Sequence, residues 1–438
     1  MASCMVCKTG MAVPRAVHID HEGFPSPIRR SSWVRARQYL GFFVLAISVV
    51  FVGTIPFATI SPLLVVALSW YPRATLLFTN WAIGCWLIMT SVSIPDCLMY
   101  AINYICLPAL QFLIGKCKYF TNTMVTTADV ETCFNINVRM FGDVGEFGDR
   151  CLLLMNHRTH LDWLFLWSVV SRYGNLYCWK AVMKSSLKHI PLYGWALQYG
   201  LHVFINRVWS DDQTELQSKL QIYNTYDLPL QLLLFPGGGD LTLKTKSCSD
   251  SYADSKGYPH YNYVLHPRLR GFLYTVNKLR SHRLDTIVDI TVAYPDALPK
   301  TELHFVRGHV PIEVHYYIRR FPLKGIPQSD EALADWIKKI WAEKEDRLKY
   351  FYTHRKFPDN SENYRSILQR AGFYHTVLFF TLINYFIYSM FSYCFYTTLL
   401  YFALSLLWLV HKIQKHGAID KLLLSSLYIK PDQDHTCL

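Results

Sequence analysis

The sequence predicts an α/β domain with a central, mostly parallel sheet and flanking helices, and with transmembrane helices at both ends of this domain. First, short apolar runs alternate with amphipathic segments through the centre of the chain, an order typical of parallel strands linked by helices. Second, both ends contain long stretches without a charged side chain. Third, 51% of the residues are hydrophobic and 17% are charged, whereas soluble domains contain about 25% charged residues.

The central region, residues 116–370, contains the segments that predict this domain. Four apolar runs have the length of buried strands: Cys151–Met155, Leu201–Ile205, Leu230–Phe235 and Asp285–Ala293. Three amphipathic segments between and after them predict helices: Leu161–Arg172, Gln213–Tyr223 and Asp330–Tyr350. The last of these is rich in charge from Lys338 onward, and we expect that part to form a solvated helix face.

The uncharged regions at both ends predict membrane segments. Tyr39–Trp70 exceeds the roughly 20 apolar residues that a spanning helix needs, although two prolines allow a kinked helix or a re-entrant hairpin instead. Uncharged windows also cover 74–95, 97–115 and 371–411. We therefore expect a basic N-terminal segment over 1–38, membrane helices over 39–115 and 371–411, the α/β domain over 116–370, and a tail over 412–438.

The charge balance points to lipid as the partner. The chain carries 44 Lys and Arg against 32 Asp and Glu, a net charge of +12 that suits anionic lipid headgroups or nucleic acid. We expect no nucleic-acid binding, because the positive charge is spread out and the chain is apolar. The 12 cysteines are scattered and do not predict a disulfide framework or a metal site.

A predicted strand, a polar turn and an apolar helix carry the residues best suited to chemistry. His157 and Asp162 are five residues apart, so on one regular helix they would point roughly 140° apart and could not touch. If His157 lies in the turn and Asp162 in the first turns of the helix, the carboxylate can bond to one ring nitrogen and leave the other as a base. The alternative is a helix cap beside a histidine that is bonded within a loop.

Four segments of the central region form a recognisable series along the chain. They are Asn156-His157 with Asp162 after four intervening residues, Gly194 with Val203–Arg207, Phe235-Pro236, and Val288–Pro295. In this order they resemble the four motifs of the glycerolipid acyltransferases, with the lysocardiolipin acyltransferases as the most similar subgroup. The resemblance covers residues 116–350 and implies the α/β fold of the family.

The third motif departs from the family pattern. The family reads Phe-Pro-Glu-Gly-Thr, whereas this chain places Gly237, Gly238 and Gly239 after the proline and Asp240 next. The resemblance gives this loop a part in binding the acceptor, and we assign all four residues to the substrate site. The backbone amides of such a loop can hold a phosphate, and Lys244 lies nearby in the sequence. We expect Asp240 to orient the loop.

The resemblance implies acyl transfer from acyl-CoA to a free hydroxyl of a lysophospholipid, such as lysophosphatidylinositol, monolysocardiolipin or lysophosphatidic acid. It makes His157 the general base, oriented by Asp162, with direct attack on the thioester and no acyl-enzyme. It also assigns Arg207 to the acceptor phosphate. We add to the substrate-binding group Lys180, for the CoA phosphates, and Asn156, which we expect to cap the turn. Acyl-CoA is a co-substrate, and we expect no other cofactor.

Other functions remain open from the sequence. The strongest alternative is a catalytically impaired family member that binds lysolipid or acyl-CoA as a scaffold, because the third motif lacks two residues of the family pattern. A membrane desaturase would need several histidine clusters, and a transporter would leave the polar centre unexplained. The family resemblance and the lack of an Asn-x-Ser/Thr sequon favour a multi-pass protein of the endoplasmic reticulum membrane with a cytosol-facing catalytic domain. The sequence leaves protein partners open.

Overall fold

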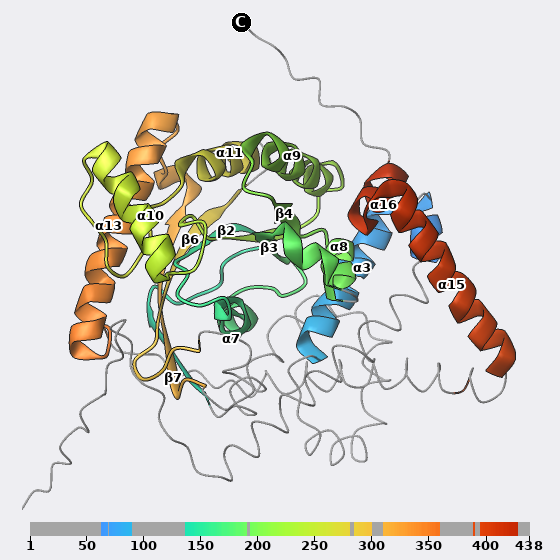
Figure 1. The fold of residues 1–438 in the computed structure, drawn as a ribbon, viewed down its shortest axis with the longest axis horizontal. Helices are drawn as coiled ribbons and strands as arrows, with labels where there is room; N and C mark the ends of the chain where they lie inside the picture. The colour runs from blue at the N-terminus through green and yellow to red at the C-terminus, as the bar shows by residue number, and fades with distance from the viewer. Residues whose placement is uncertain are drawn as a thin grey trace, which may run out of the picture.

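The computed structural model describes residues 63–68, 70–89, 136–190, 193–280, 284–299, 310–359, 389 and 395–427. Within these ranges, helices cover both faces of a central sheet (Figure 1). The helix α3 (Pro72–Met89) precedes the sheet in the chain, and the helices α15 (Phe395–His416) and α16 (Ile419–Ser426) follow it.

In the described part of the chain, seven strands form one sheet in the order β1-β7-β6-β2-β5-β3-β4. The pair β6 and β7 is antiparallel and the other neighbouring pairs are parallel, which confirms the predicted mostly parallel sheet. The strands are β1 (Asn137–Gly142), β2 (Arg150–Met155), β3 (Trp179–Lys184), β4 (Val203–Ile205), β5 (Leu230–Leu234), β6 (Thr286–Ala293) and β7 (Glu313–Pro322). Because β2 to β6 run in one direction, their carboxyl ends meet at one edge of the sheet.

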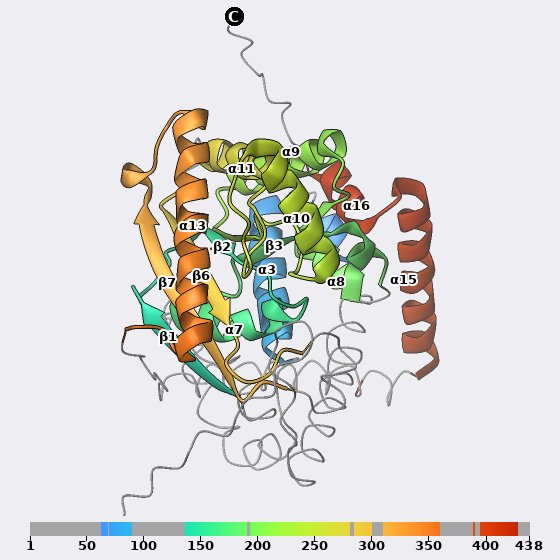
Figure 2. The same ribbon diagram turned by 60° about the vertical axis from the view of Figure 1, so that its left-hand side comes forward.

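The helices form a layer on each side of the sheet. Helix α7 lies on one face, α9 and α11 lie on the other, and α13 runs beside β6 (Figures 1 and 2). The remaining bounds are α7 (Asp162–Tyr173), η2 (Ser185–His189), α8 (Tyr193–Tyr199), α9 (Trp209–Thr225), α10 (Leu243–Lys256), α11 (Leu269–Arg280), η3 (Leu323–Gly325) and α13 (Asp330–His354).

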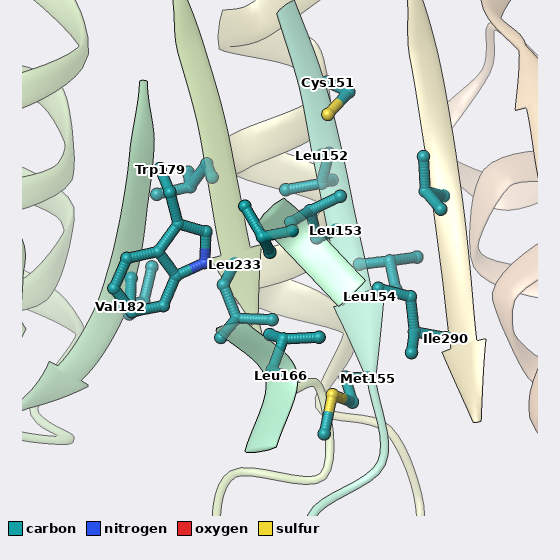
Figure 3. Packing of buried hydrophobic residues seen from close by; sticks show 14 of the residues in the cluster. Cys151, Leu152, Leu153, Leu154, Met155, Leu166, Trp179, Val182, Leu233 and Ile290 are labelled. Carbon is teal, nitrogen blue, oxygen red and sulfur yellow. The ribbon is translucent and has the colours of Figure 1, made fainter. Parts of the chain in front are cut away.

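The centre of the sheet is buried on both faces, which explains why β2 is a continuous apolar run. Its residues Cys151–Met155 are all at most 1% exposed. Figure 3 shows Leu166 of α7 in front of β2 and β5, among Leu153, Leu233 and Met155. This packing holds α7 against the carboxyl ends of the two strands, where the polar turn after β2 begins.

The predicted elements of the central region are present with shifted ends. The four apolar runs form β2, β4, β5 and β6, and the three amphipathic segments form α7, α9 and α13. Strand β4 begins at Val203 rather than at Leu201, because Leu201 adopts a left-handed turn with φ of 54°. Helix α9 begins earlier than predicted, and its first turn contains Asp211 and Asp212, which the helix dipole favours. Strands β1, β3 and β7 were not predicted from the sequence.

The charged part of α13 forms a solvated face only in part. Lys339, Asp346 and Lys349 are exposed as predicted, whereas Lys344 and Glu345 are buried. Lys344 is completely buried, and its Nζ atom lies 2.6 Å from Asp289 Oδ1 of β6 and donates to the Ile290 carbonyl at 2.7 Å. Burial lowers the pKa of Lys344 to about 8, although Asp289 opposes this effect. Arg319 of β7 donates to the other oxygen of Asp289 at 2.7 Å. A buried ionic network therefore joins α13 to β6 and β7.

Among the described residues, no helix is both long enough and apolar enough to cross a membrane. The predicted membrane regions 39–115 and 371–411 lie largely outside the described residues, which include 63–68 and 70–89 of the first and 389 and 395–411 of the second. These parts carry exposed apolar side chains, which include Leu63, Val66, Trp70, Tyr71, Tyr396, Leu400, Leu404 and Leu407.

Helix α16 packs against α8 of the α/β domain (Figure 1). The buried carboxylate of Asp420 accepts hydrogen bonds from Lys188 Nζ at 2.9 Å and from Lys219 Nζ at 3.0 Å, and the Ile419 backbone N–H donates to the Gln198 side chain at 2.8 Å. Burial alone would raise the pKa of Asp420, but Lys219 and Lys188 outweigh this effect and hold the pKa below its ordinary value. A buried ionic contact thus ties α16 to the domain.

We expect Asp420→Ala to destabilise the docking of α16 by about 3 kcal/mol, the lower end of the range for breaking a buried ion pair, because the buried Lys219 then keeps only the Glu215 carboxylate, 3.6 Å away. In the wild type, a lowered folded pKa means that this stabilisation is complete above about pH 4 and is lost as the pH falls through the lowered pKa. Limited proteolysis of α16 in purified protein measures its detachment. The exposed Lys421→Ala is the matched control. Equal cleavage rates in wild type and Asp420→Ala would contradict the prediction.

Candidate active site

The four segments that the sequence singles out lie at the same edge of the sheet. His157 comes shortly after β2, Arg207 after β4, Phe235 after β5 and Tyr294 after β6. These strands are parallel, so their carboxyl ends are neighbours. Ligands of open α/β sheets bind at this edge, outside the carboxyl ends of the strands. The fold therefore gathers the four segments where a substrate site is expected.

His157 lies in the turn between β2 and α7, and Asp162 is the first residue of α7. The His157 Nδ1 atom is 2.8 Å from Asp162 Oδ2, the contact that the sequence predicts. The carboxylate can only accept, so Nδ1 carries the proton and Nε2 is left as a basic nitrogen. The ring of His157 stacks on Phe235 with the centroids 4.2 Å apart, which fixes its plane.

Asp162 is completely buried, and its carboxylate accepts hydrogen bonds from several donors. In addition to His157, Oδ2 accepts from the backbone N–H of Arg158 at 2.6 Å and of Thr159 at 3.1 Å, and Oδ1 accepts from the Tyr294 hydroxyl at 2.5 Å. These bonds replace the water that a buried charge loses. Asp162 can therefore orient the His157 ring and stabilise a positive charge on it.

Tyr294 is a site residue that the sequence analysis did not assign, although it lies inside the fourth motif. It is 1% exposed, and burial, followed by the charge of Asp162, raises its pKa well above the ordinary value. The hydroxyl therefore stays protonated and donates a hydrogen bond to Asp162. The signal in the sequence was a polar aromatic residue directly after a buried strand, which by itself does not identify a partner.

The glycine loop, residues 236–240, is attached to His157 at both ends. Before the loop, the ring of Phe235 stacks on the His157 ring; after it, the Leu241 backbone N–H donates to the His157 carbonyl at 2.9 Å. Within the loop, Gly238 has a φ of +76° and donates to the Phe235 carbonyl at 2.9 Å. This backbone conformation strains residues that carry a Cβ atom. The loop thus wraps around the candidate base.

Two further predicted residues border the glycine loop. Arg207 is exposed, and its Nη2 atom lies 3.6 Å from the position that a Cβ atom would take on Gly239. The Asp240 carboxylate lies 3.2 Å from His160 Nδ1, so it ties the loop to the turn that carries His157. Backbone amides and Arg207 give this side of the site a positive character that suits a phosphate.

Two other residues assigned to substrate binding are buried. Asn156 is 3% exposed, and its amide donates to the Val292 carbonyl at 3.0 Å and accepts from the Val292 N–H at 2.8 Å. It therefore links β2 to β6 and does not cap the turn as expected. Lys180 in β3 is 1% exposed, and burial lowers its pKa to about 8. Contact of either residue with a substrate stays a prediction.

The groups at this edge are those of a base-catalysed reaction. A buried carboxylate orients a histidine, and the glycine loop with the positive charge of Arg207 lies beside it. Within the described ranges, no three His, Cys, Asp or Glu side chains lie close enough together to bind a metal ion. His157 can remove a proton from the hydroxyl group of a bound molecule, and Arg207 can bind an anionic group of the same molecule.

Comparisons with known proteins identify relatives of the chain. Residues 135–294 match the family described as Acyltransferase, and residues 304–384 match the description Acyltransferase C-terminus. The chain is 43% identical over 251 residues to "Lysocardiolipin acyltransferase 1" of Gallus gallus, a match that covers 56% of this chain and 66% of the relative. It is 40% identical over 257 residues to the Mus musculus protein of the same name, covering 57% and 68%. It is 31% identical over 267 residues to "Lysophosphatidylinositol acyltransferase 10" of Caenorhabditis elegans, covering 56% and 68%.

These matches extend over about two thirds of the length of the relatives. The first family match contains the first three motifs and the fourth as far as Tyr294, directly after β6. The chain therefore belongs to the glycerolipid acyltransferase family and, within it, to the subgroup of the lysocardiolipin acyltransferases.

Proposed function

We propose that this chain is an acyl-CoA-dependent O-acyltransferase that moves an acyl group to a free hydroxyl of a lysophospholipid. The observation that carries the proposal is the 2.8 Å contact between His157 Nδ1 and Asp162 Oδ2 at the carboxyl edge of the sheet. A histidine held in this way offers Nε2 as a base for a hydroxyl group. The relatives are named as acyltransferases of lysolipids, which supports the same class of acceptor.

In the proposed reaction, His157 Nε2 removes the proton of the acceptor hydroxyl while the hydroxyl oxygen attacks the carbonyl carbon of the thioester. The C–O bond of the new ester forms, the C–S bond breaks, and the CoA thiolate takes the proton from the imidazolium. The negative charge of Asp162 stabilises the imidazolium between these steps. The attack is direct, without a covalent acyl-enzyme, as the family resemblance implies.

The acceptor phosphate is proposed to lie against Arg207 and the amides of the glycine loop, beside His157. Monolysocardiolipin and lysophosphatidylinositol are the first headgroups to test because the relatives are named for them, and lysophosphatidic acid is the third. For the donor, we retain Lys180 as the candidate contact to a CoA phosphate. Since Lys180 is 1% exposed, this contact requires a movement that uncovers it.

We further propose that the enzyme acts in the endoplasmic reticulum membrane as a multi-pass protein whose catalytic domain faces the cytosol. Exposed apolar side chains before α3 and along α15 support contact with acyl chains, because water-exposed patches of this kind mark interaction surfaces. The net charge of +12 suits an anionic cytosolic leaflet. Both substrates also carry long acyl chains that favour a membrane.

His157→Ala and Asp162→Asn should each lower kcat by about 10²- to 10⁴-fold, because the first removes the base and the second removes the charge that supports it. The measurement is transfer of labelled oleoyl groups from oleoyl-CoA to a panel of lysophospholipids, in membranes without background activity. His260→Ala is the matched control, since His260 Nε2 also contacts an aspartate, Asp254, at 2.7 Å but lies exposed after α10.

Two outcomes would contradict parts of this proposal. Near-normal turnover by His157→Ala would exclude His157 as the base. A folded, membrane-inserted wild type that transfers no acyl group to any acceptor in the panel would exclude the enzyme activity and favour a scaffold that binds lysolipid or acyl-CoA.

Tyr294→Phe should lower kcat by roughly 10- to 100-fold and leave the KM for the acceptor within about twofold, because it removes one hydrogen bond to the charged Asp162 carboxylate. Tyr223→Phe is the control, since the buried Tyr223 hydroxyl donates to the Gly200 carbonyl at 3.5 Å and lies in α9. Steady-state kinetics on both variants measures the effect. A Tyr294→Phe enzyme with wild-type kcat would show that Asp162 does not depend on this bond.

A further inference from the structure

A second arginine lies on the glycine loop. Arg268 Nε is 2.9 Å from the position of a Cβ atom on Gly238, and Arg207 Nη2 is 3.6 Å from that position on the adjacent Gly239. The two guanidinium groups come from different parts of the chain, one after β4 and one just before α11. We propose that Arg268 and Arg207 together hold the phosphate of the acceptor lipid, so that Arg268 is a substrate-positioning residue. This inference rests on the proposed function.

Neither positive charge is neutralised in the described part of the chain. Among the described residues, no hydrogen bond or ion pair reaches the guanidinium of Arg207 or Arg268, and both residues are exposed. In contrast, Arg320 donates to the Asp143 carboxylate at 2.8 Å. The nearest acid in the loop sequence, Asp240, contacts His160 instead. Two unpaired guanidinium groups beside the half-buried glycine loop suit the oxygens of a phosphate.

Helix α13 fixes the backbone of the segment that leads to Arg268. The carboxylate of Glu345 accepts hydrogen bonds from three successive backbone N–H groups of the segment before Arg268, those of Asn262, Tyr263 and Val264, at 2.6, 2.9 and 3.1 Å. Burial raises the pKa of Glu345, and these three bonds oppose the rise. The segment is therefore fixed to α13 by a partly desolvated acceptor.

Two more contacts continue this attachment up to the glycine loop. Trp341 Nε1 of α13 donates to the Leu265 carbonyl at 3.0 Å, and the Arg268 backbone N–H donates to the Pro236 carbonyl at 2.8 Å. A Cβ atom on Gly237 would lie 3.2 Å from Leu265 Cβ, so the segment and the loop are packed closely. The backbone of Arg268 is therefore hydrogen-bonded to the glycine loop that its side chain borders.

Gly238 makes room for the Arg268 side chain. A Cβ atom there would come within 2.9 Å of Arg268 Nε, and the positive φ of Gly238 already disfavours other residues. The middle glycine is the one residue of the altered triplet that the family pattern also carries. The Glu and Thr of that pattern are both glycine here, so the triplet adds no side chain between the arginines and a bound phosphate.

The test separates binding of the acceptor from binding of CoA, because both molecules contain phosphate. Arg268→Gln should raise the KM for the lysophospholipid by roughly 10- to 100-fold, the range for loss of a charge-assisted hydrogen bond, while kcat and the KM for acyl-CoA stay within about twofold. Arg268→Lys should restore part of the affinity. Arg270→Gln is the matched control, since Arg270 is exposed and lies over the Trp209 ring at 5.9 Å.

The overturning outcomes are an unchanged acceptor KM, a loss confined to kcat, or a rise confined to the KM for acyl-CoA. Equilibrium binding of the same lysophospholipid to His157→Ala protein, with and without Arg268→Gln, gives a readout that does not need turnover. If the wild type shows no acyl transfer but Arg268→Gln still weakens this binding by the same factor, the proposed function fails and the arginine pair stands. If the wild type is active and Arg268→Gln leaves lysophospholipid binding unchanged, the proposed role of the arginine pair is wrong and the proposed function stands.

Discussion

The geometry of the candidate site depends on one buried charge, the carboxylate of Asp162. A carboxylate without solvent exposure costs several kcal/mol unless donors surround it. Here the donors come from the turn after β2, from the His157 ring and from Tyr294 at the end of β6. Since β2 and β6 are neighbours in the sheet but far apart in the sequence, this charge sets the turn, the ring and the end of a distant strand relative to one another.

A second pair of buried charges, on α13, fixes the segment that borders the glycine loop. Lys344 and Glu345 are adjacent on α13, and each has a different partner. Lys344 binds Asp289 and the Ile290 carbonyl of β6, whereas Glu345 binds the three amides before Arg268. The sheet therefore positions α13, and α13 positions the segment that borders the glycine loop. Its last bond, from Arg268 to the Pro236 carbonyl, returns to the loop after β5.

The parts of the fold and site that are local in sequence were predictable, and the parts that depend on long-range pairing were not. Apolar runs identified four strands because buried parallel strands lack polar alternation. The His157–Asp162 contact was predictable because both residues lie in one strand-turn-helix unit. Tyr294 and Glu345 were missed because their partners lie far away in the chain. The same reason explains why the buried charges of α13 were not predicted, since charge density does not show which charges are paired and buried.

The altered third motif can be judged by which atoms hold the glycine loop. The described attachments include the Phe235 ring, the Leu241 and Gly238 backbone N–H groups, the carbonyls of Pro236 and Asp240, and the Asp240 carboxylate. None of these atoms belongs to a side chain at positions 237 or 239, where the family pattern carries Glu and Thr. The substitutions to glycine therefore leave these attachments of the loop to His157 intact. The glycines cost conformational entropy when the loop orders. A phosphate bound between Arg207 and Arg268 would offset this cost, because it would supply contacts that the missing side chains do not make.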